Sequence, residues 1–253
     1  MRVLLISGEY PPMEGGVADF THLLGVGLAE LGAEIHVLTS IKATQAPDFQ
    51  VQCHPLMRDW SWRALYGAVR RLCDEIHPDV LNIQYQTAAY DLQPAINLFP
   101  LLNRRIPVAT TFHDLLVPYL FPKAGPLRWR ANMALARGSA AVIVTNAEDR
   151  ARLARYTWLR RLEMIPIGSN ITPALPPDYD RGAWRGRWQL GDEALLLCYF
   201  GFLNASKGGE ELVAALDHLV SAGRDAHLVM MGGAVGASDP TNRVYLKQVQ
   251  GAI

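Results

Sequence analysis

The sequence is poor in cysteine and lacks the long apolar runs of membrane-spanning chains. Its three cysteines, Cys53, Cys73 and Cys198, lie far apart, and no C-x-x-C spacing occurs in the 253 residues. This spacing supports neither a disulfide framework nor a zinc site. No apolar stretch approaches the length needed to span a bilayer, and the short run at the amino terminus ends in Pro11-Pro12 without a cleavage-like segment. We therefore expect a cytoplasmic protein.

The sequence also lacks an excess of either charge, because 24 Lys and Arg residues balance 24 Asp and Glu residues. Composition therefore gives no reason to expect nucleic acid as a partner. The distribution along the chain is less even: from Lys123 to Arg187 there are twelve basic and five acidic residues. That local excess of positive charge suits an anionic ligand, although arginines on the solvent-exposed face of a helix are the commoner cause.

What the sequence does have is a regular alternation of two patterns. Short β-branched runs occur at Arg2–Ser7, Glu34–Ser40, Asp79–Tyr85, Pro107–His113 and Ala140–Thr145. Segments of helical period lie between them, at Val17–Leu31, Trp62–Ile76, Leu127–Arg137 and Ala147–Tyr156. Runs that are apolar throughout suit strands covered on both faces. The alternation predicts an α/β protein with a doubly wound parallel sheet.

The alternation breaks after Ile165 and then begins again. The sequence P-I-G-S-N is followed by T-P-A-L-P-P, ending at Pro177, which is typical of a linker. A second set of elements follows, with strands at Leu195–Gly201 and Ala226–Met231, a helix at Gly209–Ala222, and a final helix. We expect two α/β units, residues 1–173 and 174–253, of which the second is incomplete.

The loop after the first strand, G-E-Y-P-P-M-E-G-G-V-A-D-F, leads directly into a predicted helix. Ligands of doubly wound sheets bind at the carboxyl ends of strands, where such loops lie. Gly15 and Gly16 remove side chains before a helix N-terminus, so an anion or a sugar hydroxyl can approach bare N–H groups. A positive-φ turn without a ligand explains the glycines about equally well. The pattern is not G-x-G-x-x-G, and Leu38-Thr-Ser-Ile41 offers no carboxylate for a ribose, which disfavours a dinucleotide site.

Several motifs, in order, resemble those of family-four glycosyltransferases of the GT-B fold. The opening EYPPMEGGVADFTHLLGVGLAELGAEIHVLTS is similar to the start of that family's amino domain. The further matches are Thr110-Thr-Phe-His-Asp114, Ala141-Val-Ile-Val-Thr-Asn-Ala-Glu148, Ile165-Pro-Ile-Gly-Ser-Asn170, Phe200-Gly-Phe-Leu-Asn-Ala-Ser-Lys-Gly208 and Leu228-Val-Met-Met-Gly-Gly233. No single motif is decisive, but together they cover nearly the whole chain.

The resemblance implies a Rossmann-like amino domain, an incomplete second Rossmann-like domain, and sugar transfer from a nucleotide-sugar donor with retention of configuration. It implies two catalytic residues: Lys207 would stabilise the donor diphosphate, and His113 would contact the donor sugar. The implied donor-binding residues are Gly15, Gly16, Gly201, Lys207 and Gly208. The acceptor would be a glycan, a lipid-linked molecule or a small molecule. No metal or other cofactor is expected, and no D-x-D is present to hold a metal.

The sequence also departs from the family pattern. Phe202 stands where the family usually has a donor-binding Arg, and Ile167 and Asn170 replace the Asn and the acid of I-P-N-G-I-D. The family's paired glutamates would fall beyond Ile253. We therefore expect this chain alone to be inactive, and the alternative is a non-catalytic acceptor-binding or interaction module. The segment Phe121–Arg130 mixes basic and aromatic residues, which suggests peripheral contact with the inner face of a membrane. An ordinary helix start explains that segment more simply.

Overall fold

The computed structural model describes residues 1–44, 50–103, 105–113, 115, 125–171, 173–201, 203, 207–232 and 241–251. Its contacts divide the chain into two compact units, Met1–Asn170 and Ile171–Ile253.

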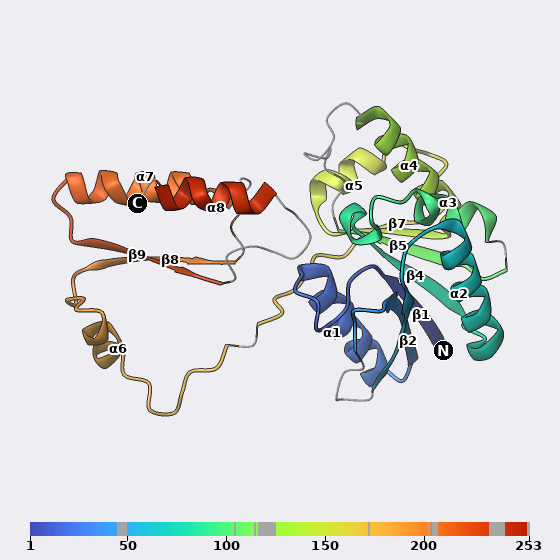
Figure 1. Cartoon of the computed structure of the whole chain (residues 1–253), viewed down its shortest axis with the longest axis horizontal. Helices are drawn as coiled ribbons and strands as arrows, with labels where there is room; N and C mark the ends of the chain where they lie inside the picture. Colours follow the sequence, from blue (N-terminus) through green and yellow to red (C-terminus); the bar gives the residue numbers. More distant parts are fainter. Residues whose placement is uncertain are drawn as a thin grey trace. The chain divides into compact units, whose positions relative to one another are not determined.

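The first unit contains a seven-stranded sheet in the order β3-β2-β1-β4-β5-β6-β7 (Figure 1). All of its strand pairs are parallel. The strands are β1 (Arg2–Ser7), β2 (Glu34–Ser40), β3 (Val51–Met57), β4 (Val80–Tyr85), β5 (Val108–Phe112), β6 (Ala141–Val144) and β7 (Leu162–Met164). The helical segments are α1 (Gly16–Glu30), α2 (Trp62–Ile76), η1 (Thr87–Tyr90), α3 (Ala95–Leu102), α4 (Gly125–Gly138) and α5 (Ala147–Leu153). The predicted α/β class with a doubly wound parallel sheet is confirmed.

Alternate residues of each strand pack into different layers because side chains alternate across a sheet. Leu4 and Ile6 of β1 belong to a large apolar cluster with side chains of α2, α3 and α4. Val3 and Leu5 belong to a smaller cluster, against which side chains of α1 pack. Figure 1 shows α1 and α2 on opposite sides of the sheet. Helices therefore cover both faces of the central strands.

Five elements of the structure were not predicted, of which η1 is a single short turn. Strand β3 contains His54-Pro55, a break in any strand pattern, but β3 is the edge strand, where proline is tolerated. Helix α3 is apolar nearly throughout and contains Pro100, so it shows no helical period. Strand β7 has only three residues. The short helix α6 (Arg181–Arg187) lies just after the segment read as a linker.

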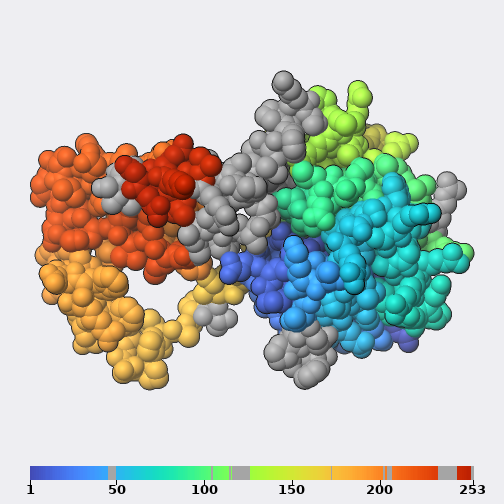
Figure 2. Space-filling model, in the orientation of Figure 1, coloured from blue at the N-terminus to red at the C-terminus, as the bar shows by residue number. Residues whose placement is uncertain are grey.

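The second unit contains the parallel pair β8 (Leu195–Phe200) and β9 (Ala226–Met231), with helices α7 (Gly209–Ser221) and α8 (Thr241–Gly251). Figures 1 and 2 show α7 and α8 side by side. The buried side chains of this unit's core are Leu203, Val213, Tyr245 and Val249, and side chains of both strands pack against them. The two helices therefore share one small core with the strand pair.

Candidate functional site

Helix α1 begins with an uncapped N-terminus at the carboxyl end of β1. Its N-cap is Gly15, which has no side chain, so no side-chain hydrogen bond caps the helix. The first N–H groups of a helix have no partner within the helix. A Cβ on Gly16 would meet no atom within 4 Å. The first turn of α1 therefore has no side-chain cap at Gly15 and open space beside Gly16.

A carboxyl group that the sequence reasoning missed lies against this loop. Glu9 is only 6% exposed, and a Cβ on Gly15 would overlap its carboxylate oxygen. Burial raises the pKa of Glu9 above its ordinary value. The backbone oxygen of Glu9 accepts a hydrogen bond from the hydroxyl of Ser7 at 2.6 Å. An acid within the G-E-Y-P-P stretch was the visible signal for this residue.

A row of polar side chains lies buried on one face of β4 and β5. Asn82 and Gln84 alternate along β4, and Gln84 pairs in register with Thr111 of β5. The amide nitrogen of Gln84 donates to the side-chain oxygen of Asn82, and the amide nitrogen of Asn82 donates to the hydroxyl of Thr111 at 3.5 Å. All three are buried. Burying polar groups is tolerated because each has a partner.

His113 stands at the end of this row, just after β5. Its Nε2 lies 2.8 Å from Oε1 of Gln84, and because an amide oxygen can only accept, Nε2 carries the proton. Burial lowers the pKa of His113 to about 4, so the ring is neutral at pH 7. The lone pair of Nδ1 then remains as an acceptor. Asp114, which follows His113, lies outside the described residues.

The structure brings His113 and the first turns of α1 together. The ring of Phe20 packs edge-on against the ring of His113, with centroids 4.8 Å apart. Phe20 lies four residues after Gly16, about one helical turn further along α1. The buried row and the uncapped helix start therefore meet at the carboxyl edge of the sheet, where ligands of this fold class bind. Neither Phe20 nor Gln84 was predicted, although the polar positions in V-L-N-I-Q-Y were visible in the sequence.

The remaining predicted site residues lie at the carboxyl end of β8 in the second unit. Gly201 and Gly208 have positive φ angles of 132° and 69°, a conformation that favours glycine. Gly208 is the N-cap of α7, and the exposed Lys207 directly precedes it. Residues Phe202 and Asn204–Ser206 of the same motif lie outside the described residues.

The N-terminus of α7 is already partly occupied by the protein itself. Glu210 and Glu211 lie in its first turn, where carboxylates complement the helix dipole. The backbone N–H of Glu210 donates to the hydroxyl of Tyr245 at 3.1 Å. Lys207 is therefore the side chain at this turn best suited to an anion.

A metal site, a reactive thiol or a membrane-spanning helix would be a further sign of function in the described part of the chain. No group of three or more His, Cys, Asp or Glu residues there is arranged to hold a metal ion. Burial raises the pKa of the thiols of Cys53 and Cys73 to about 11. No described helix combines the length and the apolar character needed to cross a membrane.

The basic and aromatic segment Phe121–Arg130 is described only from Gly125 onward. There it forms the start of α4. The half-buried Trp129 donates its ring N–H to the hydroxyl of Tyr156 at 3.2 Å. This packing fits the simpler explanation of an ordinary helix start.

Comparison with protein families places the sequence motifs in context. The family model described as "Glycosyl transferase 4-like domain" matches residues 15–168, more than half of the chain. The chain belongs to this glycosyltransferase family. The match includes Gly15, Gly16 and His113, and it confirms the resemblance inferred from the motifs.

Two kinds of relatives agree with that assignment. A GDP-mannose-dependent alpha-(1-6)-phosphatidylinositol monomannoside mannosyltransferase of Mycobacterium tuberculosis is 25% identical over 249 residues, which cover 92% of this chain and 61% of the relative. The chain thus spans less than two thirds of that relative's length. Sucrose-phosphate synthase from Thermosynechococcus elongatus has a similar structure, with a TM-score of 0.72 at 19% identity over 100% of this chain and 68% of the other. The structure of WaaG, a glycosyltransferase involved in lipopolysaccharide biosynthesis, has a TM-score of 0.57 at 14% identity, and the match covers 99% of this chain and 67% of WaaG. The fold is that of GT-B glycosyltransferases.

Proposed function

We propose that the chain takes part in the transfer of a sugar from a nucleotide-sugar donor to an acceptor, with retention of anomeric configuration. The acceptor class is a glycan, a lipid-linked molecule or a small molecule. The observation that carries the proposal is the meeting of the uncapped α1 N-terminus with His113 inside the region matched by the family model.

The first requirement of such a transfer is stabilisation of the leaving diphosphate. Negative charge grows on the diphosphate as its bond to the anomeric carbon breaks. Donors fixed in advance toward that charge lower the barrier. In this proposal the bare N–H groups after Gly15 are such donors in the first unit. The ammonium of Lys207 is the corresponding donor of the second unit, where Phe202 stands at the family position of an arginine.

The second requirement is orientation of the sugar. His113 is neutral at pH 7 because its pKa is about 4, so it is not suited to donate a proton at that pH. Its Nε2–H is held by Gln84, which leaves Nδ1 to accept a hydrogen bond from a sugar hydroxyl. His113 is thus proposed to position the donor sugar.

The experiment is a binding titration of this chain with a panel of nucleotides in the presence of EDTA. GDP-mannose heads the panel because the mycobacterial relative is named for it, followed by UDP-glucose and UDP-N-acetylglucosamine, with NAD as the comparator. We expect at least one nucleotide sugar to bind without metal and NAD not to bind. Failure of every nucleotide sugar to bind, or tighter binding of NAD, would overturn the proposal.

Two variants assign the binding to the predicted residues. Lys207→Ala should weaken donor binding about tenfold or more, as expected for a lost hydrogen bond from a charged group. Lys247→Ala, an exposed lysine of α8, is the matched control and should bind normally. Where transfer is observed, NMR of the product reports the anomeric configuration. An inverted configuration would contradict the proposed retention.

A further inference from the structure

A cavity lies in the first unit, at the edge of the sheet opposite the candidate site. Its volume is about 620 Å³, and its lining includes Pro107 and Val108 at the start of β5. His113 follows the end of the same strand, so the five residues of β5, at about 3.3 Å each, separate the two places by roughly 16 Å. The cavity is therefore distinct from the proposed donor site.

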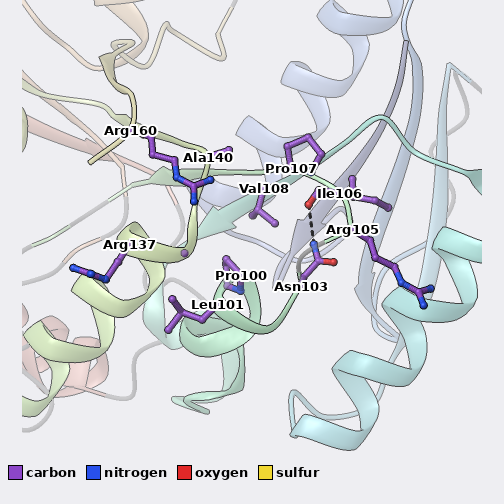
Figure 3. Close-up of a pocket in the computed structure, with 11 residues that line it drawn as sticks. Pro100, Leu101, Asn103, Arg105, Ile106, Pro107, Val108, Arg137, Ala140 and Arg160 are labelled. Carbon is purple, nitrogen blue, oxygen red and sulfur yellow. Dashed lines mark hydrogen bonds between the residues drawn. The ribbon is translucent and has the colours of Figure 1, made fainter. Parts of the chain in front are cut away.

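Three arginines from separate segments line this cavity: Arg105 after α3, Arg137 in α4, and Arg160 before β7. Figure 3 shows the side chain of Arg160 extending toward the middle of the pocket, whereas the side chains of Arg105 and Arg137 lie on opposite sides of it and extend outward. Two of them belong to the stretch with excess basic charge noted in the sequence. The fold collects these dispersed charges at one place.

The cavity carries no described counterion for these arginines. Among the described residues that line it there is no Asp or Glu, and the structure shows no ion pair of the three arginines with a described carboxylate. Arg137 does pack over the ring of Trp158, at 5.6 Å from the centroid, which orders its side chain. Like charges gathered without acids create a positive potential that favours an anion.

Complementing helix dipoles is the simpler role for such arginines, and it does not account for all of them. Helices α3 and α4 end beside the cavity, each with roughly half a negative charge at its C-terminus. Arg137 lies in the last turn of α4 and fits that role. Arg105 and Arg160 lie outside helices, and three full charges exceed two half charges. A net positive site remains.

Part of the cavity lining is apolar. It includes Pro100, Leu101, Val108 and Ala140. Gly138 lets α4 approach α3 closely, because a Cβ there would lie 2.7 Å from the backbone nitrogen of Leu101. Apolar residues beside charged groups suit a ligand that carries more than a bare inorganic anion.

We propose that this cavity binds a phosphate ester of an organic molecule. Guanidinium groups match phosphate oxygens with paired N–H donors. The volume lies within the range of small-molecule sites, so the organic part can rest on the apolar residues of the lining while Arg160 holds the phosphate and Arg105 and Arg137 add positive potential around it. The shared chemistry, a phosphate ester, occurs both in soluble metabolites and in lipid headgroups.

The test measures hydrogen exchange of the whole chain with and without inorganic pyrophosphate, because exchange localises binding even if the donor site also takes pyrophosphate. We expect slower exchange in residues 100–108 and 137–141. The variant R105Q/R137Q/R160Q should lose this protection and bind pyrophosphate at least about tenfold more weakly there, a modest effect because salt screens exposed charges. The control R58Q/R63Q/R150Q removes the same charge at exposed positions outside the cavity and should behave as the wild type. If the triple variant unfolds, Arg160→Gln alone replaces it.

A second arm, sedimentation with phosphatidylcholine vesicles containing phosphatidic acid, identifies the source of the phosphate. Sedimentation that the cavity variant abolishes and the control retains assigns a headgroup, whereas protection by pyrophosphate without sedimentation assigns a soluble phosphate compound. Equal protection from hydrogen exchange in the cavity variant and the wild type would overturn the proposal. So would the absence of protection in both cavity segments, if the cavity variant also sediments with vesicles as the wild type does.

Discussion

The two faces of the seven-stranded sheet carry different kinds of side chain from the same strands. On one face, Leu4, Ile83 and Phe112 are fully buried in the large apolar cluster. On the other face, one residue along, β4 and β5 place Gln84 and Thr111 in a buried polar row that ends at His113. The first face holds the fold together, and the second orients a histidine at the ligand-binding edge. Because strand periodicity separates the two roles, single substitutions can address each.

The largest expected effect is on the apolar face. Phe112 is fully buried and packs edge-on against Tyr85, with ring centroids 5.4 Å apart. Phe112→Ala should reduce the free energy of unfolding by about 3–5 kcal/mol, through lost burial and a cavity. Urea unfolding measures this loss. Thr111→Ala, on the other face of the same strand, should cost about 1 kcal/mol, and equal losses would remove the distinction between the faces.

A smaller loss of stability with a larger loss of binding is expected on the polar face. Gln84→Met removes the partner of His113 Nε2 and of the Asn82 side-chain oxygen. Leaving buried polar groups unpaired should cost about 1–3 kcal/mol of unfolding free energy. The variant should also weaken nucleotide-sugar binding, because His113 loses its orientation. Unchanged affinity by calorimetry would show that the row is only structural.

The next effect appears only in acid. The pKa of His113 is about 4 in the folded chain, against an ordinary value of 6.5. Between these values the unfolded chain takes up a proton that the folded chain does not, so stability falls as the pH is lowered from 6.5 to 4 and this contribution levels off below 4. His113→Gln should remove roughly 3 kcal/mol of that decline. Identical profiles of unfolding free energy against pH for the variant and the wild type would mean that the ring is more exposed to solvent than the structure shows.

The smallest effect concerns Glu9. Burial raises its pKa, so the charged carboxylate destabilises the folded chain at neutral pH, and stability gained from protonation appears as the pH falls through the raised pKa. Glu9→Gln should therefore give a small increase in the urea midpoint at pH 7 that disappears in acid. A decrease at pH 7 would mean that the carboxylate makes a favourable interaction beside the α1 N-terminus.

The sequence predicted the fold wherever one pattern dominated locally. β1, β2 and α2 were predicted with their observed bounds, because their apolar periods are unbroken. Edge strand β3 and the proline-containing α3 were missed, since their stability comes from neighbours rather than from their own pattern.

The candidate site could be predicted only in part. Gly15, Gly16 and His113 were found because they lie in recognisable motifs. Gln84 and Phe20 contact His113 through strand register and helix packing, and neither relation is visible in a linear sequence. The arginine cavity was missed for the same reason, because its members lie far apart in the chain.

The central claim is that the bare start of α1 binds the donor, and a pair of glycine substitutions in that helix tests it directly. A Cβ at Gly16 or at Gly27 would meet no atom within 4 Å, so Gly16→Ala and Gly27→Ala should both leave the fold intact. Calorimetric titration with the nucleotide sugar that binds the wild type should show affinity reduced about tenfold or more in Gly16→Ala, equivalent to ~1.4 kcal/mol, and unchanged in Gly27→Ala. Equal affinity in the two variants would contradict the account.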